Sequence, residues 1–268
     1  MSDLAKRLGV AVWGIPLLLI SLYIGGLLLG VLISFLLFSL VFEWRHLGKQ
    51  IGADSPLILF WLLAASILFF QFSHYSKLSI GVAMLAMLVV FVSEIFRASR
   101  LPLKSLGHLT LWLIYIVIPI SLLWTIREPG GIAGDKGERW LIALFIFVWI
   151  ADTAAYGIGR KFGKHKLMPK ASPNKSWEGA IAGFISVPIV ALLLNVTGFI
   201  HLSLYDILAL TIIVGFIGQV GDLLESLMKR EAQLKDTSRF LPGHGGLLDR
   251  FDSLLLATPA LTLYLFLR

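Results

Sequence analysis

The feature that most constrains this chain is a series of apolar stretches, each about as long as a lipid bilayer is thick. A membrane-spanning helix needs roughly 20 apolar residues, and stretches of about this length recur throughout the sequence. They are residues 1–23, 25–43, 55–73, 78–96, 106–126, 139–158, 177–198, 204–226 and 246–267. Because lipid offers no hydrogen bonds to the backbone, each stretch is expected to be helical. The sequence therefore predicts an all-α polytopic integral membrane protein with about nine transmembrane helices.

Composition excludes an ordinary soluble domain. Hydrophobic residues make up 57% of the chain and charged residues only 15%, against averages of about 45–50% and about 25% for soluble domains. With no cysteine, any metal site needs oxygen or imidazole ligands. The net charge of +7 is explained by basic cytoplasmic loops, so no nucleic-acid partner is predicted.

The basic residues also predict the orientation of the chain. If the N-terminus is cytoplasmic, eighteen of the 23 Lys and Arg residues fall in cytoplasmic segments, as the positive-inside rule requires. Lys6 and Arg7 precede the first apolar stretch, as in a signal peptide, but no convincing small-x-small cleavage site follows, so an uncleaved helix is expected. We expect the N-terminus inside, the C-terminus outside, and the polar loops late in the chain in the cytoplasm.

Residues 221–253 gather acids, bases and glycines in an otherwise apolar chain. Spacings of three and four place one polar set on a single helix face: Asp222, Glu225, Ser226 and Lys229. Asp249 and Asp252 likewise share a face at the start of the last helix. Between them lies the turn at residues 242–246, whose glycines allow backbone amides to approach a ligand closely. Carboxylates, cations and bare amides together suit phosphoryl or nucleotidyl transfer.

A second polar segment spans residues 152–179. Asp152 lies inside an apolar stretch, which makes it a functional candidate, although a buried hydrogen bond between helices is the alternative. The six basic residues from Arg160 to Lys175 could be positive-inside residues alone. Residues 172–179 predict a rigid turn into a helix capped by Ser176, and the amides at such a helix start favour an anion.

Both segments resemble one enzyme family. The string Ser226-Leu-Met-Lys229-Arg230, then Lys235-Asp236, Pro242-Gly-His-Gly-Gly and Asp249-Arg-Phe-Asp252 is similar to the signature of the phosphatidate cytidylyltransferases, the CDP-diacylglycerol synthases. The string from Ser172 to Gly179 is similar to the family's nucleotide-binding string, except that Asn174 stands where a second Lys is common. The resemblance implies that CTP and phosphatidate, a membrane lipid, give CDP-diacylglycerol and pyrophosphate.

The reaction implied by the resemblance sets the roles expected of these residues. A phosphomonoester has a second pKa of about 6, so phosphatidate is already ionised and needs charge neutralisation and positioning more than a strong base. The expected catalytic residues are Asp222, Lys229, His244 and Asp249, and the expected ligands of Mg²⁺ are Asp222, Asp249 and Asp252, with a second cation left open. The expected substrate-binding residues are Arg160, Ser172, Lys175, Ser176, Lys235, Arg239, Gly243, Gly245, Gly246 and Arg250.

The rest of the chain carries less chemistry. Glu43 with Arg45, and Glu94 with Arg97, are expected to be interfacial ion pairs, with a place at the lipid entrance left open. Residues 1–100 are predicted to be a membrane scaffold with lipid access, 101–138 a middle helix and outside loop, and 139–268 the catalytic membrane domain. The bacterial inner membrane is the expected location, and a homodimer is left open.

Three alternatives remain at this point. A polyprenol kinase or an archaeal CDP-lipid synthase would also use CTP in the membrane. An ion-coupled transporter would use intramembrane acids and broken helices, but the two halves of this chain show no matching polar breaks. A structural scaffold would have no use for so many polar groups within its helices.

Overall fold

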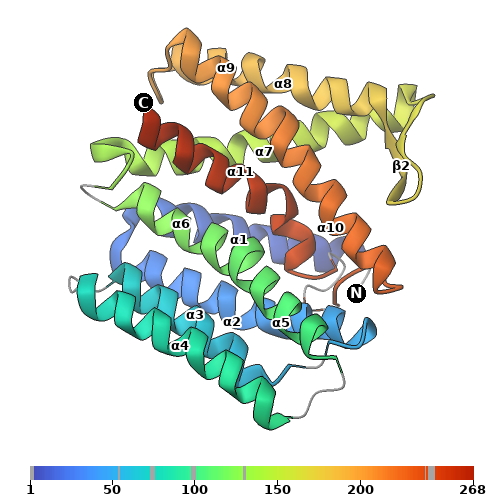
Figure 1. Ribbon diagram of the computed structural model, residues 1–268. Helices are drawn as coiled ribbons and strands as arrows, with labels where there is room; N and C mark the ends of the chain where they lie inside the picture. The colour runs from blue at the N-terminus through green and yellow to red at the C-terminus, as the bar shows by residue number, and fades with distance from the viewer. Residues whose placement is uncertain are drawn as a thin grey trace.

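The structure, a computed structural model, describes residues 3–53, 55–72, 76–97, 101–128, 131–238, 240 and 245–268. Helices lie side by side through most of the molecule (Figure 1). The N-terminal half contains α1 (Asp3–Ile24), α2 (Gly26–Gln50), α3 (Leu57–Phe72), α4 (Ser76–Arg97) and a rod built from α5 (Pro102–Leu111), the π-helix η1 (Trp112–Val117) and α6 (Ile118–Arg127).

The C-terminal half follows the short 3₁₀ helix η2 (Gly134–Lys136). It contains α7 (Gly137–Phe162), β1 (Lys166–Met168), β2 (Ser172–Ser176), α8 (Trp177–Val196), a rod of α9 (Leu204–Ile212), the π-helix η3 (Ile213–Gly218) and α10 (Gln219–Glu231), and α11 (Leu248–Leu267). The hairpin, the end of α10 and the beginning of α11 lie toward the same end of the bundle (Figure 1).

Six helical segments of the described residues are long and apolar enough to cross a membrane: Gly26–Gln50, Pro102–Arg127, Gly134–Phe162, Trp177–Val196, Leu204–Glu231 and Leu248–Leu267. These segments point to an integral membrane protein and confirm the helical, polytopic part of the prediction. The described parts of the other three apolar stretches are helical too, in α1, α3 and α4. The count of nine crossings and the orientation stay predictions.

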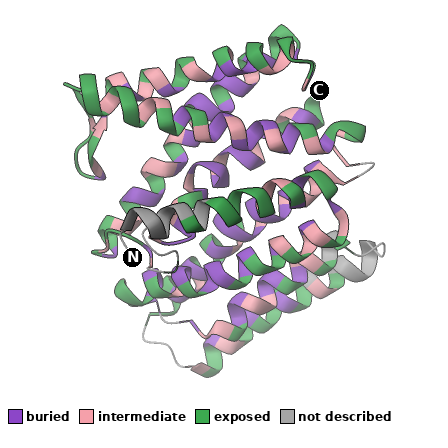
Figure 2. Ribbon diagram, turned by 180° about the vertical axis from the view of Figure 1, so that it is seen from behind, coloured by how far each residue is buried: buried purple, intermediate pink, exposed green. Residues whose placement is uncertain are grey.

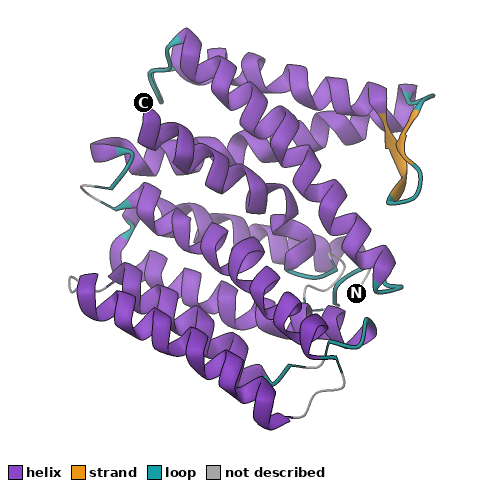
Figure 3. Ribbon diagram, in the orientation of Figure 1, coloured by secondary structure: helices purple, strands orange, loops and turns teal. Residues whose placement is uncertain are grey.

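Among the described residues, the two-stranded hairpin of β1 and β2 interrupts the helical fold (Figure 3). The sequence predicted only a turn there. The strands pair antiparallel, with Lys166 opposite Ser176 and Met168 opposite Ser172. Each of those two positions, 168 and 172, precedes a proline, which favours an extended backbone. The backbone N–H of Ala171 donates to the Met168 carbonyl over 3.1 Å and closes the turn around Pro169.

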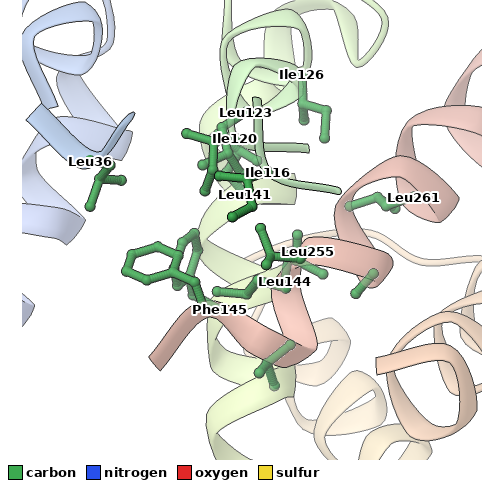
Figure 4. Close-up of a cluster of buried hydrophobic side chains, with 14 of the residues drawn as sticks. Leu36, Ile116, Ile120, Leu123, Ile126, Leu141, Leu144, Phe145, Leu255 and Leu261 are labelled. Carbon is green, nitrogen blue, oxygen red and sulfur yellow. The ribbon is translucent and has the colours of Figure 1, made fainter. Parts of the chain in front are cut away.

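The apolar core joins the two halves of the chain. Leucine, isoleucine and phenylalanine side chains of α6, α7 and α11 converge in Figure 4, among them Ile120, Leu144, Phe145 and Leu255. Ile120 lies in α6, and Leu144 and Phe145 lie in α7, the next long helix of the chain. Leu255 lies in α11, the last helix. Figure 2 shows buried residues along the inner faces of the helices and exposed ones around the outside. The core therefore fixes where the polar ends of α10 and α11 lie.

Helices α7 and α8 pack closely because small residues face each other. A Cβ atom on Gly179 would lie 2.6 Å from the Ala155 carbonyl oxygen and 3.1 Å from the Gly159 Cα. A Cβ on Gly183 would lie 3.0 Å from the Ala151 carbonyl oxygen. Such close approach of two helix backbones is typical of helix pairs in membranes. It holds the start of α8 and its hairpin against α7.

Replacing Gly179 with Ala tests this packing. The added methyl forces the two backbones apart, so we expect the Gly179→Ala protein to be less stable by about 1–3 kcal/mol. Gly157→Ala is the matched control, because a Cβ on Gly157 meets nothing within 4 Å. Thermal unfolding in detergent should show a lower Tm for Gly179→Ala only; equal Tm values for both variants would contradict the packing.

Candidate active site

The polar face predicted for residues 222–229 is present on α10. Glu225 and Ser226 are buried there. The Lys229 ammonium lies 2.5 Å from Glu225 Oε2 and 2.6 Å from Asp249 Oδ1. Lys229 therefore joins α10 to the first turn of α11 through two carboxylates that would otherwise be buried without a counter-charge.

Asp249 organises the segment that leads into α11. While its Oδ1 accepts a hydrogen bond from Lys229, its Oδ2 accepts three more: from the Thr237 N–H over 3.2 Å, the Thr237 hydroxyl over 3.1 Å and the Gly246 N–H over 2.8 Å. Both carboxylate oxygens are thus engaged by the protein. Asp249 therefore holds Thr237 and Gly246 close to Lys229 of α10.

A second carboxylate reaches the same segment from the other side. Glu43, on α2, is only 4% exposed and accepts four hydrogen bonds. The donors are the Thr237 hydroxyl (2.8 Å), the Ser238 hydroxyl (2.6 Å) and the backbone N–H groups of Leu247 and Leu248 (2.8 Å each). Amides at a helix start have no partner within the helix, so Glu43 satisfies two of them at the start of α11.

The prediction that Glu43 is a snorkelling, exposed carboxylate is therefore wrong, because its side chain is buried against residues near the start of α11. The sequence signal was present, because Glu43 closes an apolar stretch, and an acid at membrane depth is a functional candidate by default. Arg45 instead donates from Nε to the Ser55 carbonyl over 2.9 Å. The predicted ion pair between Glu94 and Arg97 is confirmed, although Glu94 is buried.

The hairpin brings the second polar segment to α10. Lys175, on β2, forms an ion pair with Asp222, and Arg230 donates from Nε to the Ala171 carbonyl over 3.1 Å. Ser176 caps α8 by accepting from the Gly179 N–H over 3.2 Å, which confirms the predicted cap. The two polar segments found in the sequence therefore form one site.

The remaining substrate-binding candidates are exposed or half-buried, or lie outside the described residues. Arg160, Lys235 and Arg250 are exposed, and Arg160 donates to the Tyr156 hydroxyl over 3.1 Å. Ser172 is half-buried in β2. Arg239, Gly243 and His244 lie outside the described residues, so their predicted roles stay predictions.

The two described glycines of the turn serve packing as well. Gly245 has a φ of +84°, a left-handed conformation that favours glycine. A Cβ on Gly246 would lie 1.9 Å from the Thr237 hydroxyl oxygen and 2.6 Å from Glu43 Oε2. The absence of a side chain at Gly246 is what lets both carboxylates, Glu43 and Asp249, reach this segment.

A cavity of about 780 Å³ opens between α2 and residues 234–240. Its apolar lining includes Phe38, Phe42 and Phe240, and its polar lining includes Asp236 and Ser238. A volume in this range is typical of ligand sites. The cavity has Glu43 and Thr237 in its wall, so it adjoins the Asp249 network directly.

Comparison with known proteins identifies the family. The model described as "Cytidylyltransferase family" matches residues 5–268. The chain belongs to the cytidylyltransferase family.

Individual relatives agree with this family. A protein of Bacillus subtilis named phosphatidate cytidylyltransferase is 30% identical over 97% of both chains. A protein of that name from Staphylococcus saprophyticus is 36% identical over 68% of both chains. Another, from Staphylococcus epidermidis, is 44% identical over 49% of this chain, and the match spans only about half the length of that relative.

The acids of this cytidylyltransferase are the candidate ligands for a cation. Within the ranges that the structure describes, no three acidic or histidine side chains already surround a single point as metal ligands. Asp252 lies near Asp152, Asp222 and Glu225, and the salt bridges that the described residues form with these acids come from Lys175 and Lys229. An excess of carboxylates and an all-oxygen donor set fit a hard cation such as Mg²⁺.

Lys229 should be essential for stability as well as for any chemistry. Lys229→Met leaves Glu225 and Asp249 buried without their shared cation, so we expect a loss of about 3–5 kcal/mol. Adding Glu225→Gln removes one of the two orphaned charges and should restore part of that loss. Thermal unfolding in detergent measures both changes.

The control is Lys235→Met, since Lys235 is exposed and its replacement should change Tm little. A Lys229→Met protein that melts together with the wild type would show that the buried ion pairs contribute nothing.

Proposed function

We propose that this cytidylyltransferase transfers the cytidylyl group of CTP to phosphatidate, giving CDP-diacylglycerol and pyrophosphate. The observation that carries the proposal is the joining of two polar segments, through Lys175 with Asp222 and through Lys229 with Asp249. Cations and carboxylates from both segments therefore lie together beside α10, which supports the proposal. The names of the relatives supply the substrates.

The bond changes are those of a single displacement at phosphorus. A phosphate oxygen of the lipid forms a bond to the α-phosphorus of CTP. The bond from that phosphorus to the oxygen bridging to the β-phosphate breaks, and its electron pair leaves with pyrophosphate. Because both reactants are anions, positioning and charge neutralisation are the main demands on the protein.

The basic residues meet the demand for positive charge. Lys175 and Lys229 lie in the centre of the site, and the exposed Arg160, Lys235 and Arg250 lie around it. We assign them to the phosphates of CTP and of the lipid. The amides of the 242–246 turn, with Arg239 and His244, are proposed to hold the departing pyrophosphate.

The carboxylates complete the proposal. Asp222, Asp249 and Asp252 would hold Mg²⁺, which when bound neutralises phosphate charge and orients the triphosphate. Asp249 already accepts from Lys229 and from the backbone N–H groups of Thr237 and Gly246, so Asp222 and Asp252 offer the freer carboxylate oxygens. Lys175 must then move from Asp222 toward a phosphate when the nucleotide binds.

The lipid reaches this site from within the bilayer. We propose that the cavity between α2 and residues 234–240 admits it, because aromatic side chains line one part and polar groups beside the Asp249 network line another. The proposal also includes nine crossings, a cytoplasmic N-terminus, and a site on the cytoplasmic side of a bacterial inner membrane. A homodimer stays a prediction.

The position of the label in radioactive CTP tests the reaction class. Purified protein in detergent is given phosphatidate, Mg²⁺ and CTP labelled with ³²P at either the α- or the γ-phosphate. We expect the α-label in the lipid extract and the γ-label in pyrophosphate, because nucleotidyl transfer keeps the α-phosphate. Chelation of Mg²⁺ should abolish the transfer.

Asp222→Asn should lower the rate of this transfer by about 10²-fold or more, since it removes a charge at the proposed cation site. The matched control is Asp135→Asn, an exposed acid in η2, which should leave the rate unchanged. Label from the γ-phosphate in lipid would instead show a lipid kinase, and no lipid label from either position would exclude both reactions.

A further inference from the structure

Glu43 stands apart from the residues of the signature. It comes from α2, about two hundred positions before its partners, yet all four of its hydrogen bonds go to residues 237–248. A charged residue at the end of a membrane helix usually keeps its charged group in water at the membrane interface. Glu43 is 4% exposed, and its hydrogen bonds to described residues go to one distant segment, so a role in positioning that segment explains it better.

The four hydrogen bonds are divided evenly between the two oxygens of Glu43. Oε1 accepts from the Ser238 hydroxyl and the Leu247 N–H, and Oε2 accepts from the Thr237 hydroxyl and the Leu248 N–H. An ionised carboxylate is an acceptor at both oxygens, whereas the side-chain amide of Gln presents an acceptor and a donor. Gln at position 43 would point its side-chain N–H at a group that is itself a donor, such as the N–H of Leu247 or Leu248.

Thr237 transmits the position of Glu43 to Asp249. Its side chain is fully buried, and its hydroxyl oxygen lies 2.8 Å from Glu43 Oε2 and 3.1 Å from Asp249 Oδ2. A hydroxyl has only one proton to donate, so it can serve one of these carboxylates at a time. The backbone N–H of Thr237 stays bonded to Asp249 in either case.

We propose that Glu43 is a positioning residue of the nucleotidyl transfer. It holds Thr237, Ser238, Leu247 and Leu248 from the side of α2 and thereby sets the place of Asp249. The positive end of the α11 dipole favours its negative charge. Glu43 acts through Thr237 and the amides of Leu247 and Leu248. This inference rests on the proposed function.

Glu43→Gln is the decisive variant, with Glu94→Gln as its control. Glu94 is also a buried glutamate near the end of an apolar helix, but its ion pair with Arg97 is local. We expect Glu43→Gln to lower kcat/KM for CTP by about 10- to 100-fold, since small displacements of catalytic groups cost this much. The KM for phosphatidate and the activity of Glu94→Gln should stay within twofold of wild type.

A purely structural role predicts another result. Glu43→Gln would then lower Tm but leave the kinetic constants of the folded protein unchanged, and kinetic constants within twofold of wild type would overturn the proposal. If Glu43→Gln does not fold, Thr237→Val and Thr237→Ser take its place. Thr237→Val should reduce kcat/KM for CTP, and Thr237→Ser, which keeps the hydroxyl, should restore it; equal values for the two would overturn the proposal.

Binding of CTP keeps this test separate from the choice of lipid. If wild-type protein forms no CDP-diacylglycerol, the proposed function fails. The role of Glu43 is then tested by the rise in Tm that CTP and Mg²⁺ produce. The rise should be smaller in Glu43→Gln than in wild type or Glu94→Gln. Equal rises in the three proteins would overturn the positioning role.

Discussion

The Asp249 carboxylate is the interaction on which the rest of the site depends. A buried charge is tolerated only if hydrogen bonds and a counter-charge replace water. Asp249 obtains the counter-charge from Lys229 of α10 and its other hydrogen bonds from Thr237 and Gly246. Satisfying this one group therefore fixes α10, the connecting segment and the start of α11 relative to one another.

Two further carboxylates extend this arrangement through the fold. Glu43 brings α2 to the same segment by way of Thr237, and Asp222 brings the hairpin to α10 by way of Lys175. Segments far apart in sequence thus meet around one polar centre. The apolar core formed by α6, α7 and α11 (Figure 4) holds the helices in place. An arrangement that concentrates charge at one end of apolar helices suits a reaction between a lipid and a water-soluble polyanion.

Much of this could be predicted from the sequence, because the relevant signals are local. Apolar runs predicted the helices of the six candidate spans. Spacings of three and four predicted that Glu225 and Lys229 share one face of α10. The cap at Ser176 was predicted from its place before a helix. In each case, residues close in sequence determine the structure, so periodicity and residue type suffice.

What could not be predicted depends on contacts between distant residues. Nothing near Glu43 in sequence indicates that its partners are Thr237, Ser238, Leu247 and Leu248. Spacing also suggested that Asp249 and Asp252 act alike. In the structure their hydrogen bonds differ: Asp249 accepts from donors before α11, such as the Gly246 N–H, whereas Asp252 accepts from the N–H of the next residue, Ser253. The hairpin was missed because prolines at 169 and 173 indicate turns as readily as extended strands.

Hydrogen exchange at the start of α11 tests the account most directly. The amides of Thr237 and Gly246 donate to Asp249, and those of Leu247 and Leu248 donate to Glu43. Wild-type protein in detergent should protect all four, and Glu43→Gln should speed exchange at residues 246–248 while the Gly179 amide, bonded to Ser176, is unchanged. Identical exchange at residues 246–248 in the two proteins would show that Glu43 does not hold this segment.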